Sequence, residues 1–146
     1  MQGSPGCFAE LVRVLHDFAG GTMTRARQAL GQLGEDLACR ELQRRGYAIL
    51  ARRFRTRFGE IDVVARDGPT LVFVEVKTRR TAAFGGPTAA VNAAKQRRLV
   101  NMARSYLLGL GGPAPPCRFD VVGVTANPGR PPVLDVVRDA FSARAP

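Results

Sequence analysis

The sequence predicts an α/β protein in which helices pack on a mixed β-sheet. Apolar residues recur at helical spacing in two long segments, about 24–45 and 88–108, and short β-branched runs lie between and after them. The order helix, strand, hairpin, helix, strand is expected when helices cover such a sheet. The chain of 146 residues, 45% of them hydrophobic, is long enough for one normal core. We expect residues 1–22 to form a mobile or peripheral extension and 23–146 a single domain.

The first expected element is a helix that begins near Thr24 and ends near Arg45. Five apolar side chains at helical spacing form its buried stripe: Leu30, Leu33, Leu37, Ala38 and Leu42. Gly46 then supplies a left-handed cap. Glu35 lies at the edge of this stripe, where a carboxylate is either solvated or, if the helix crosses the hairpin, hydrogen-bonded to a metal-bound water.

The next expected elements are a strand, Tyr47–Arg53, and a hairpin. The hairpin strands are Glu60–Arg66 and Leu71–Lys77, and the turn between them is Asp67-Gly68-Pro69-Thr70. Antiparallel pairing across this turn sets Arg66 opposite Leu71. Counting back along the strands gives two more pairs on one face: Asp62 with Glu75, and Glu60 with Lys77.

Asp62 and Glu75 are therefore candidate metal ligands. Directly opposed like charges are destabilising unless a partner neutralises them. Mg²⁺ suits carboxylates, and the backbone carbonyl of Val76 could be a third protein ligand. Such a cation would clamp a phosphate oxygen and lower the pKa of a bound water, while Lys77 would stabilise negative charge or orient the nucleophile. The alternative is an ordinary hairpin with solvated acids and a salt-bridged lysine.

A glycine-rich loop over residues 81–87 follows the hairpin, and we expect it to be a flap that closes over a duplex. The next helix, about 88–108, has an apolar stripe formed by Val91, Leu99, Met102, Ala103 and Tyr106. Lys95 falls inside this stripe. Its charge must be paired or face a polar site. It either reaches the surface or, as we favour, reaches the acidic cluster or the scissile phosphate.

Two strands are expected after a loop at 109–116. Arg118–Thr125 is the first, and Val133–Val137 is a last, edge strand. Asp120 stands near the start of the first strand. We interpret it as a structural residue that pairs with Arg118, and not as a metal ligand.

The composition favours a nucleic-acid partner. The net charge is +10 and the pI is about 11.1, which indicates a polyanion. Tryptophan is absent and aromatics are few, so we expect phosphate contacts and no broad platform for base stacking. Among 22 basic residues only Lys77 and Lys95 are lysine, and arginine cannot replace lysine in proton transfer.

Several function classes are disfavoured. His16 is the only histidine, and the three cysteines form no CxxC motif, so a zinc site or a Ser-His-Asp triad is not expected. The loop after Lys77 lacks the order of a nucleotide-binding P-loop. No apolar run approaches membrane-spanning length, and we expect a cytoplasmic protein with free thiols.

Taken together, these residues resemble the YraN-like family of bacterial proteins, within the restriction-endonuclease-like PD-(D/E)xK nuclease superfamily. The resemblance covers about residues 25–135. Its most specific part is the string GEIDVVARDGPTLVFVEVKTR, and the other matching pieces are Gly34-Glu35, Gly46-Tyr47, Lys95 with Arg98-Leu99, and Arg118–Val122. Ile61 departs from the superfamily pattern, which has proline there. A Q-x-x-x-Y motif of the RecB type is absent at Gln96.

The resemblance implies a restriction-endonuclease-like fold and a metal-dependent phosphodiesterase core of Asp62, Glu75 and Lys77. Similarity to archaeal Holliday-junction resolvases adds Glu35 as a first-helix carboxylate and makes a homodimer an expectation. Our leading hypothesis is a Mg²⁺- or Mn²⁺-dependent deoxyribonuclease, with branched DNA as a candidate substrate. The residues expected to hold the nucleic acid are Arg55, Arg57, Arg79, Arg80, Lys95 and Arg98. The alternatives are a noncatalytic nucleic-acid-binding protein with a nuclease fold and an RNA-directed nuclease.

Overall fold

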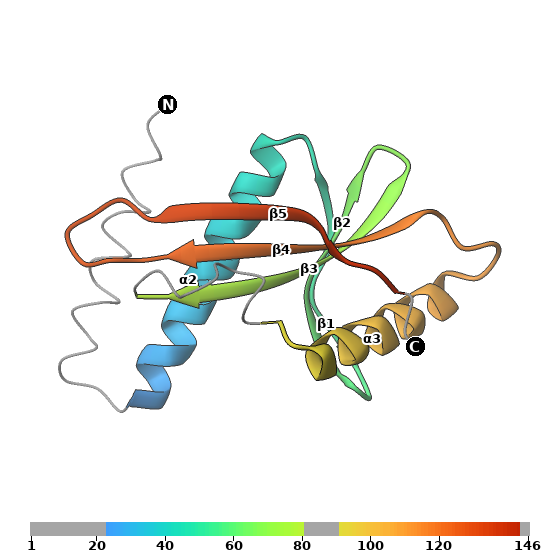
Figure 1. Cartoon of the computed structure of the whole chain (residues 1–146), viewed down its shortest axis with the longest axis horizontal. Helices are drawn as coiled ribbons and strands as arrows, with labels where there is room; N and C mark the ends of the chain where they lie inside the picture. The colour runs from blue at the N-terminus through green and yellow to red at the C-terminus, as the bar shows by residue number, and fades with distance from the viewer. Residues whose placement is uncertain (1–22, 81–90, 144–146) are drawn as a thin grey trace.

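The computed structural model describes residues 23–80 and 91–143, which form one five-stranded mixed sheet with a helix on each face (Figure 1). The strand order is β1-β2-β3-β4-β5. In chain order the elements are α2 (Met23–Arg44), β1 (Ala48–Thr56), β2 (Gly59–Asp67), β3 (Thr70–Arg79), α3 (Ala93–Leu110), β4 (Cys117–Thr125) and β5 (Val133–Phe141). The predicted class, a mixed sheet flanked by helices, is confirmed. Neither helix is long and apolar enough to cross a membrane within these described ranges.

The sheet is mixed because one of its four strand pairs is parallel. The β3–β4 pair runs parallel, with Glu75 paired to Val121, while the other three pairs are antiparallel. A parallel connection needs a crossover, usually a helix, and α3 lies between β3 and β4 in the chain. β5 is an edge strand, as predicted, but it continues to Phe141.

Each helix closes a separate apolar core. On the α2 face, Ala38 and Leu42 pack on side chains of the central strands: Val63, Ala65, Val72, Val74, Val122 and Val124. On the other face α3 packs on Ile61, Val64, Leu71, Phe73, Phe119 and Val121. The predicted helix stripes are confirmed, since most of their residues are buried in these two cores.

The hairpin forms with the predicted register near its turn. Arg66 pairs with Leu71, and Asp67 pairs with Thr70, so the loop is only Gly68 and Pro69. Gly68 has a φ of +57°, a conformation that a two-residue hairpin loop needs and glycine adopts without strain.

The start of α3 differs from the prediction. The helix begins at Ala93 because Asn92 caps it, its side chain accepting a hydrogen bond from the Lys95 backbone N–H at 3.0 Å. It also continues to Leu110, into the segment predicted to be a loop. The expected flap at 81–87, the expected helix start at 88–90 and the extension at 1–22 lie outside the described residues.

Candidate functional site

The predicted acidic pair lies where the hairpin ladder ends. The β2–β3 pairs run from Asp67↔Thr70 only as far as Val63↔Val74. The expected backbone pairs of Asp62 with Glu75 and of Glu60 with Lys77 are therefore not among them. Glu60 pairs instead with Arg55 of β1, and their side chains form an ion pair at 3.2 Å.

Both β1 and β2 are irregular where the β2–β3 pairs end. Ile61 packs in the core under α3, whereas Val63 packs in the core under α2. Residues two apart on a regular strand share a face, so the alternation breaks at Asp62. On β1 the pairs skip Arg53, which has a φ of +51°. The break turns Asp62 out of the regular ladder.

Beyond the last β2–β3 backbone pair, the Asp62 carboxylate serves as a hydrogen-bond acceptor for β3. Its Oδ2 accepts a hydrogen bond from the backbone N–H of Val76 at 2.8 Å. The N–H and C=O of one strand residue point toward the same neighbouring strand, so the Val76 carbonyl points to the Asp62 side of β3. The three predicted metal ligands, Asp62, Glu75 and this carbonyl, are thus neighbours.

Glu75 connects the site to two lysines. Its Oε1 lies 2.9 Å from Lys77 Nζ and 3.9 Å from Lys95 Nζ. The Glu75 side chain is only 13% exposed and that of Lys77 only 22%. Lys95 therefore reaches the acidic cluster from α3, as we favoured, and both lysines of the chain meet at one carboxylate oxygen.

The electrostatics of these groups show mutual strain. Burial, and then the charge of Glu75, raise the pKa of Asp62 from 3.8 to about 7, although the Val76 N–H opposes this rise. The contact with Lys77, together with burial, lowers the pKa of Lys95. Burial acts to lower the pKa of Lys77, but contacts with Lys95 and Glu75 outweigh it and the net change is upward. The charged forms of Asp62 and Lys95 are therefore both disfavoured at this site.

Glu35 comes to this site from α2 through a close helix–strand approach. Gly34 is buried against β3, and a Cβ built on it would lie 1.8 Å from Thr78 Oγ1. Glu35 adds to the rise in the pKa of Asp62, so it lies near enough to act on that group. Its Oε2, however, accepts a hydrogen bond from Arg53 Nε at 2.7 Å. Residue spacing alone carries no signal for this Arg53 partner.

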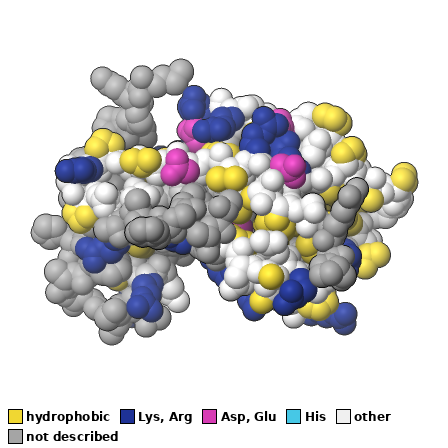
Figure 2. All heavy atoms as spheres, viewed as in Figure 1, with side chains coloured by type: hydrophobic (Ala, Val, Ile, Leu, Met, Phe, Trp, Pro, Cys, Tyr) yellow, Lys and Arg dark blue, Asp and Glu magenta, His cyan; other side chains and the backbone are white. Residues whose placement is uncertain are grey.

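The residues predicted to contact nucleic acid do not form one cluster in the structure. Arg57 stacks over Phe58, with 4.7 Å from its Cζ to the ring centroid, and Arg55 is tied to Glu60. Arg98 approaches the β1–β2 turn at Gly59. The two remaining predicted residues, Arg79 and Arg80, end β3 and follow it. Figure 2 shows Lys and Arg side chains spread over the visible face among scattered acids, without one continuous stripe.

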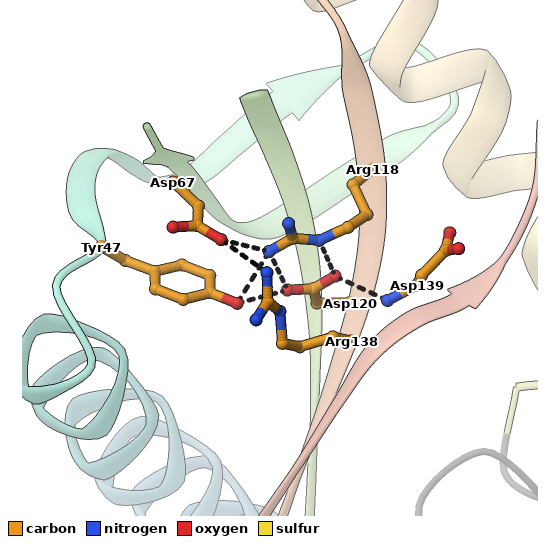
Figure 3. A network of polar contacts seen from close by, with 6 residues as sticks. All are labelled: Tyr47, Asp67, Arg118, Asp120, Arg138 and Asp139. Atoms are coloured by element: carbon orange, nitrogen blue, oxygen red, sulfur yellow. Dashed lines mark hydrogen bonds and ion pairs between the residues drawn. The ribbon is translucent and has the colours of Figure 1, made fainter. Parts of the chain in front are cut away.

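A second charged cluster is structural, as predicted for Asp120. Its Oδ2 accepts from Tyr47 Oη at 2.8 Å, and its Oδ1 accepts from Arg118 Nε at 2.8 Å (Figure 3). Arg118 also donates to Asp67, and the Asp139 backbone N–H donates to Asp120. Asp120 is 1% exposed, and these donors compensate its charge fully.

Within residues 23–80 and 91–143, no group of three or more His, Cys, Asp or Glu side chains is arranged to hold a metal ion. The candidate site offers two carboxylates and a backbone carbonyl, with Glu35 held by Arg53. Such a donor set suits an oxygen-seeking cation that keeps several waters. It does not suit zinc.

Comparison with known proteins finds one family. The model of the uncharacterised protein family UPF0102 matches residues 34–124. A UPF0102 protein of Symbiobacterium thermophilum is 51% identical over 114 residues, which cover 78% of this chain and 97% of the relative. A UPF0102 protein of Nocardia farcinica is 47% identical over 115 residues, covering 79% and 91%. A third, of Streptomyces griseus, is 50% identical over 114 residues, covering 77% and 96%.

Proposed function

The chain belongs to the uncharacterised protein family UPF0102, and from the acidic site that it carries we propose that it is a Mg²⁺-dependent nuclease. The proposed reaction is hydrolysis of a phosphodiester bond, with DNA as the first substrate to test. The proposed fold family is the restriction-endonuclease-like one, since the mixed sheet bears its acids and Lys77 on the central hairpin. A shared fold alone would not establish the chemistry, so the proposal depends on the site.

The observation that carries the proposal is the state of Asp62. It lies beside Glu75, forms no ion pair with a lysine or arginine among the described residues, and has a pKa raised to about 7. A purely structural carboxylate is normally paired, as Asp120 is with Arg118. Perturbed acids of this kind cluster at functional sites because their cost is balanced by a ligand or a reaction.

The residues present fit a hard divalent cation. Asp62 and Glu75 would bind it through carboxylate oxygens, and Val76 through the carbonyl that points to the Asp62 side. When bound, Mg²⁺ or Mn²⁺ would supply charge for a phosphate oxygen and an acidified water. Glu75 would then have to exchange part of its contact with Lys77, whose ammonium would be released toward the substrate.

The remaining groups have separate roles in this proposal. Lys77 would orient the attacking water and offset charge that develops on the phosphorane. Lys95, 3.9 Å from the same Glu75 oxygen, would hold a nonbridging phosphate oxygen. Glu35 would hydrogen-bond water on the α2 side after Arg53 moves away. Arg55, Arg57, Arg79, Arg80 and Arg98 would contact flanking phosphates.

The direct test is cleavage of supercoiled plasmid and of a four-way junction with Mg²⁺ or Mn²⁺. We expect cleavage by the wild type and a loss of at least about 100-fold in Asp62→Ala, Glu75→Ala and Lys77→Ala. Asp36→Ala is the matched control, because Asp36 is a neighbouring acid on α2 that forms its ion pair with Arg52. Equal cleavage by the wild type and all three site variants would refute the proposal.

A second function is supported by the ion pairs of the site. Glu35 is engaged by Arg53, and Glu75 by Lys77, which is the arrangement that a nuclease fold without metal would have. In that case the protein would be a noncatalytic nucleic-acid binder with salt-dependent affinity. Calorimetric titration with Mn²⁺ separates the two functions, since only the nuclease should bind metal and lose that binding in Asp62→Asn.

The class of nucleic acid and the assembly are further proposals. An RNA-directed nuclease would use the same residues, so labelled DNA and RNA of one sequence should be offered in competition. A homodimer is proposed from the resemblance to resolvases, and sedimentation with and without a junction would test it. Cleavage of labelled DNA in the presence of a large excess of unlabelled RNA would support DNA as the substrate.

A further inference from the structure

The tip of the β1–β2 hairpin carries an exposed aromatic side chain. Phe58 is 38% exposed. Every other aromatic residue in the described ranges packs in or against one of the two cores; these are Tyr47, Phe54, Phe73, Tyr106, Phe119 and Phe141. A single exposed apolar side chain is ordinary, so its surroundings decide whether it has a role.

The turn beneath Phe58 is held firmly. Thr56 Oγ1 donates to the Gly59 carbonyl at 2.9 Å and accepts from the Phe58 backbone N–H at 3.1 Å. Gly59 has a φ of +132°, and a Cβ built there would lie 3.4 Å from Met102 Sδ on α3. The tip therefore rests on α3, and Phe58 is displayed from a fixed backbone.

Arginine side chains lie at the turn that carries this ring. The Arg57 guanidinium stacks on it at 4.7 Å, and the Arg98 side chain lies beside the same turn. Neither arginine forms an ion pair with an acid in the described part of the chain. The Arg55 side chain, 88% exposed, stands at the same end of β1. A partly exposed aromatic ring with arginine side chains beside it offers contacts for the two parts of a nucleotide, the base and the phosphate.

The position of the tip also suits the acidic site. Phe58 precedes Asp62 by four residues, which is about 13 Å along an extended strand. A nucleic acid strand bound along β2 would therefore meet the tip close to the reacting phosphate, within a short run of nucleotides. A continuous duplex offers no free base face at such a point, whereas a single strand or a branch does.

We propose that Phe58 and Arg57 form a stacking site for an unpaired base, which directs this protein to single-stranded or branched nucleic acid. Phe58 provides the π-face and Arg57 the contact to the adjoining phosphate. The location of the scissile bond rests on the proposed nuclease function, but the stacking site does not. It therefore remains testable in protein that cannot cleave.

The experiment measures binding by the full chain carrying Asp62→Ala, in buffer with EDTA. The probes are a labelled single strand, a fork and a blunt duplex, with 2-aminopurine in the single strand to report stacking. Adding Phe58→Ala or Phe58→Leu should weaken binding to the single strand and fork by about 10-fold and to the duplex by less than about 2-fold. Phe58→Tyr keeps the π-face and should retain binding and 2-aminopurine quenching.

Salt dependence separates the two residues. Arg57→Ala should reduce the slope of log affinity against log salt by about one, while Phe58→Leu should leave the slope unchanged. Unchanged unfolding midpoints will show that all variants fold. The inference is overturned if Phe58→Leu binds the fork as tightly as its parent, or if it weakens duplex and fork equally. Absent cleavage by the wild type would count against the nuclease only, because stacking is measured without it.

Discussion

Removing one charge from the acidic pair should stabilise the metal-free protein. Asp62→Asn keeps an oxygen that can accept the Val76 N–H but eliminates the negative charge beside Glu75. The pKa of Asp62 is 3.8 ordinarily and about 7 in the folded protein. The folded state thus binds the proton more tightly than the unfolded chain. The stability that this proton provides is present below about pH 4 and is lost as the pH rises through about 7.

The size of this effect follows from the two pKa values. A rise from 3.8 to about 7 corresponds to an upper limit of about 4 kcal/mol at about 1.4 kcal/mol per pKa unit. Part of it is recovered when the end of the hairpin relaxes and water enters, so we expect Asp62→Asn to gain about 2 kcal/mol at pH 8. The difference should shrink as the pH falls and nearly vanish only below about pH 4, where the unfolded chain carries the proton as well.

Urea unfolding with EDTA at pH 4.5, 6, 7 and 8 would measure this gain. Adding Mg²⁺ at pH 8 should stabilise the wild type and leave Asp62→Asn unchanged, because a ligand that binds only the folded state adds stability. Asp120→Asn is the control, since its buried carboxylate is paired with Arg118 and its loss should destabilise at every pH. A variant Asp62→Asn that is no more stable than the wild type at pH 8, or equally more stable at pH 4.5, would refute the reasoning.

Three further outcomes are expected. Gly34→Ala should lower the free energy of unfolding in urea by about 1–3 kcal/mol and disturb Glu35, because the new Cβ would lie 1.8 Å from Thr78 Oγ1. Gly31→Ala is the control and should be neutral or slightly stabilising, because its Cβ meets nothing within 4 Å. Equal losses of stability in the two variants would contradict this account. Mn²⁺ affinity by calorimetry should rise between pH 6 and pH 8, because Asp62 must lose its proton to bind metal; a flat profile would contradict it. Arg118→Met should lower the free energy of unfolding by about 3–5 kcal/mol, because it leaves the buried Asp120 carboxylate without its ion-pair partner. Arg104→Met, at an exposed position on α3, should lower it by less than about 0.5 kcal/mol. Similar losses in the two variants would show that the Asp120 network is dispensable.

The fold could be predicted because its signals are local. The periodicity of α2, the glycine after it and the Gly68-Pro69 turn each specify their own stretch of backbone. The start of α3 was placed too early because the sequence Thr88-Ala89-Ala90-Val91 contains no residue that excludes a helix. The boundary is decided by the Asn92 cap, which is a single side-chain contact. Edge strand β5 was made too short because its later residues carry charge, which an edge tolerates.

The site could be predicted in its members but not in its geometry. Counting residues from the turn placed Asp62 near Glu75, and the structure brings them together with Lys77 and Lys95. Counting assumes a regular ladder, however, and the ladder ends at Val63↔Val74. The kink at Asp62 arises from packing of Ile61 and Val63 into different cores. The Arg53 contact to Glu35 depends on that tertiary arrangement too, which no spacing encodes.

The contrast between the two charged clusters bears on where the proposed function lies. Around Asp120 the β4–β5 register also shifts, between Phe119 and Val121, but the carboxylate has donors on both oxygens and an ion pair with Arg118. Around Asp62 the backbone pairing stops, one N–H is given to a side chain, and a neighbouring acid stays close enough to raise its pKa. The two sites therefore differ in the pairing of the acid and not in the regularity of the strands. Asp120 has Arg118 as its ion-pair partner, whereas Asp62 forms no ion pair among the described residues, and this difference is the physical reason to place the proposed function at Asp62.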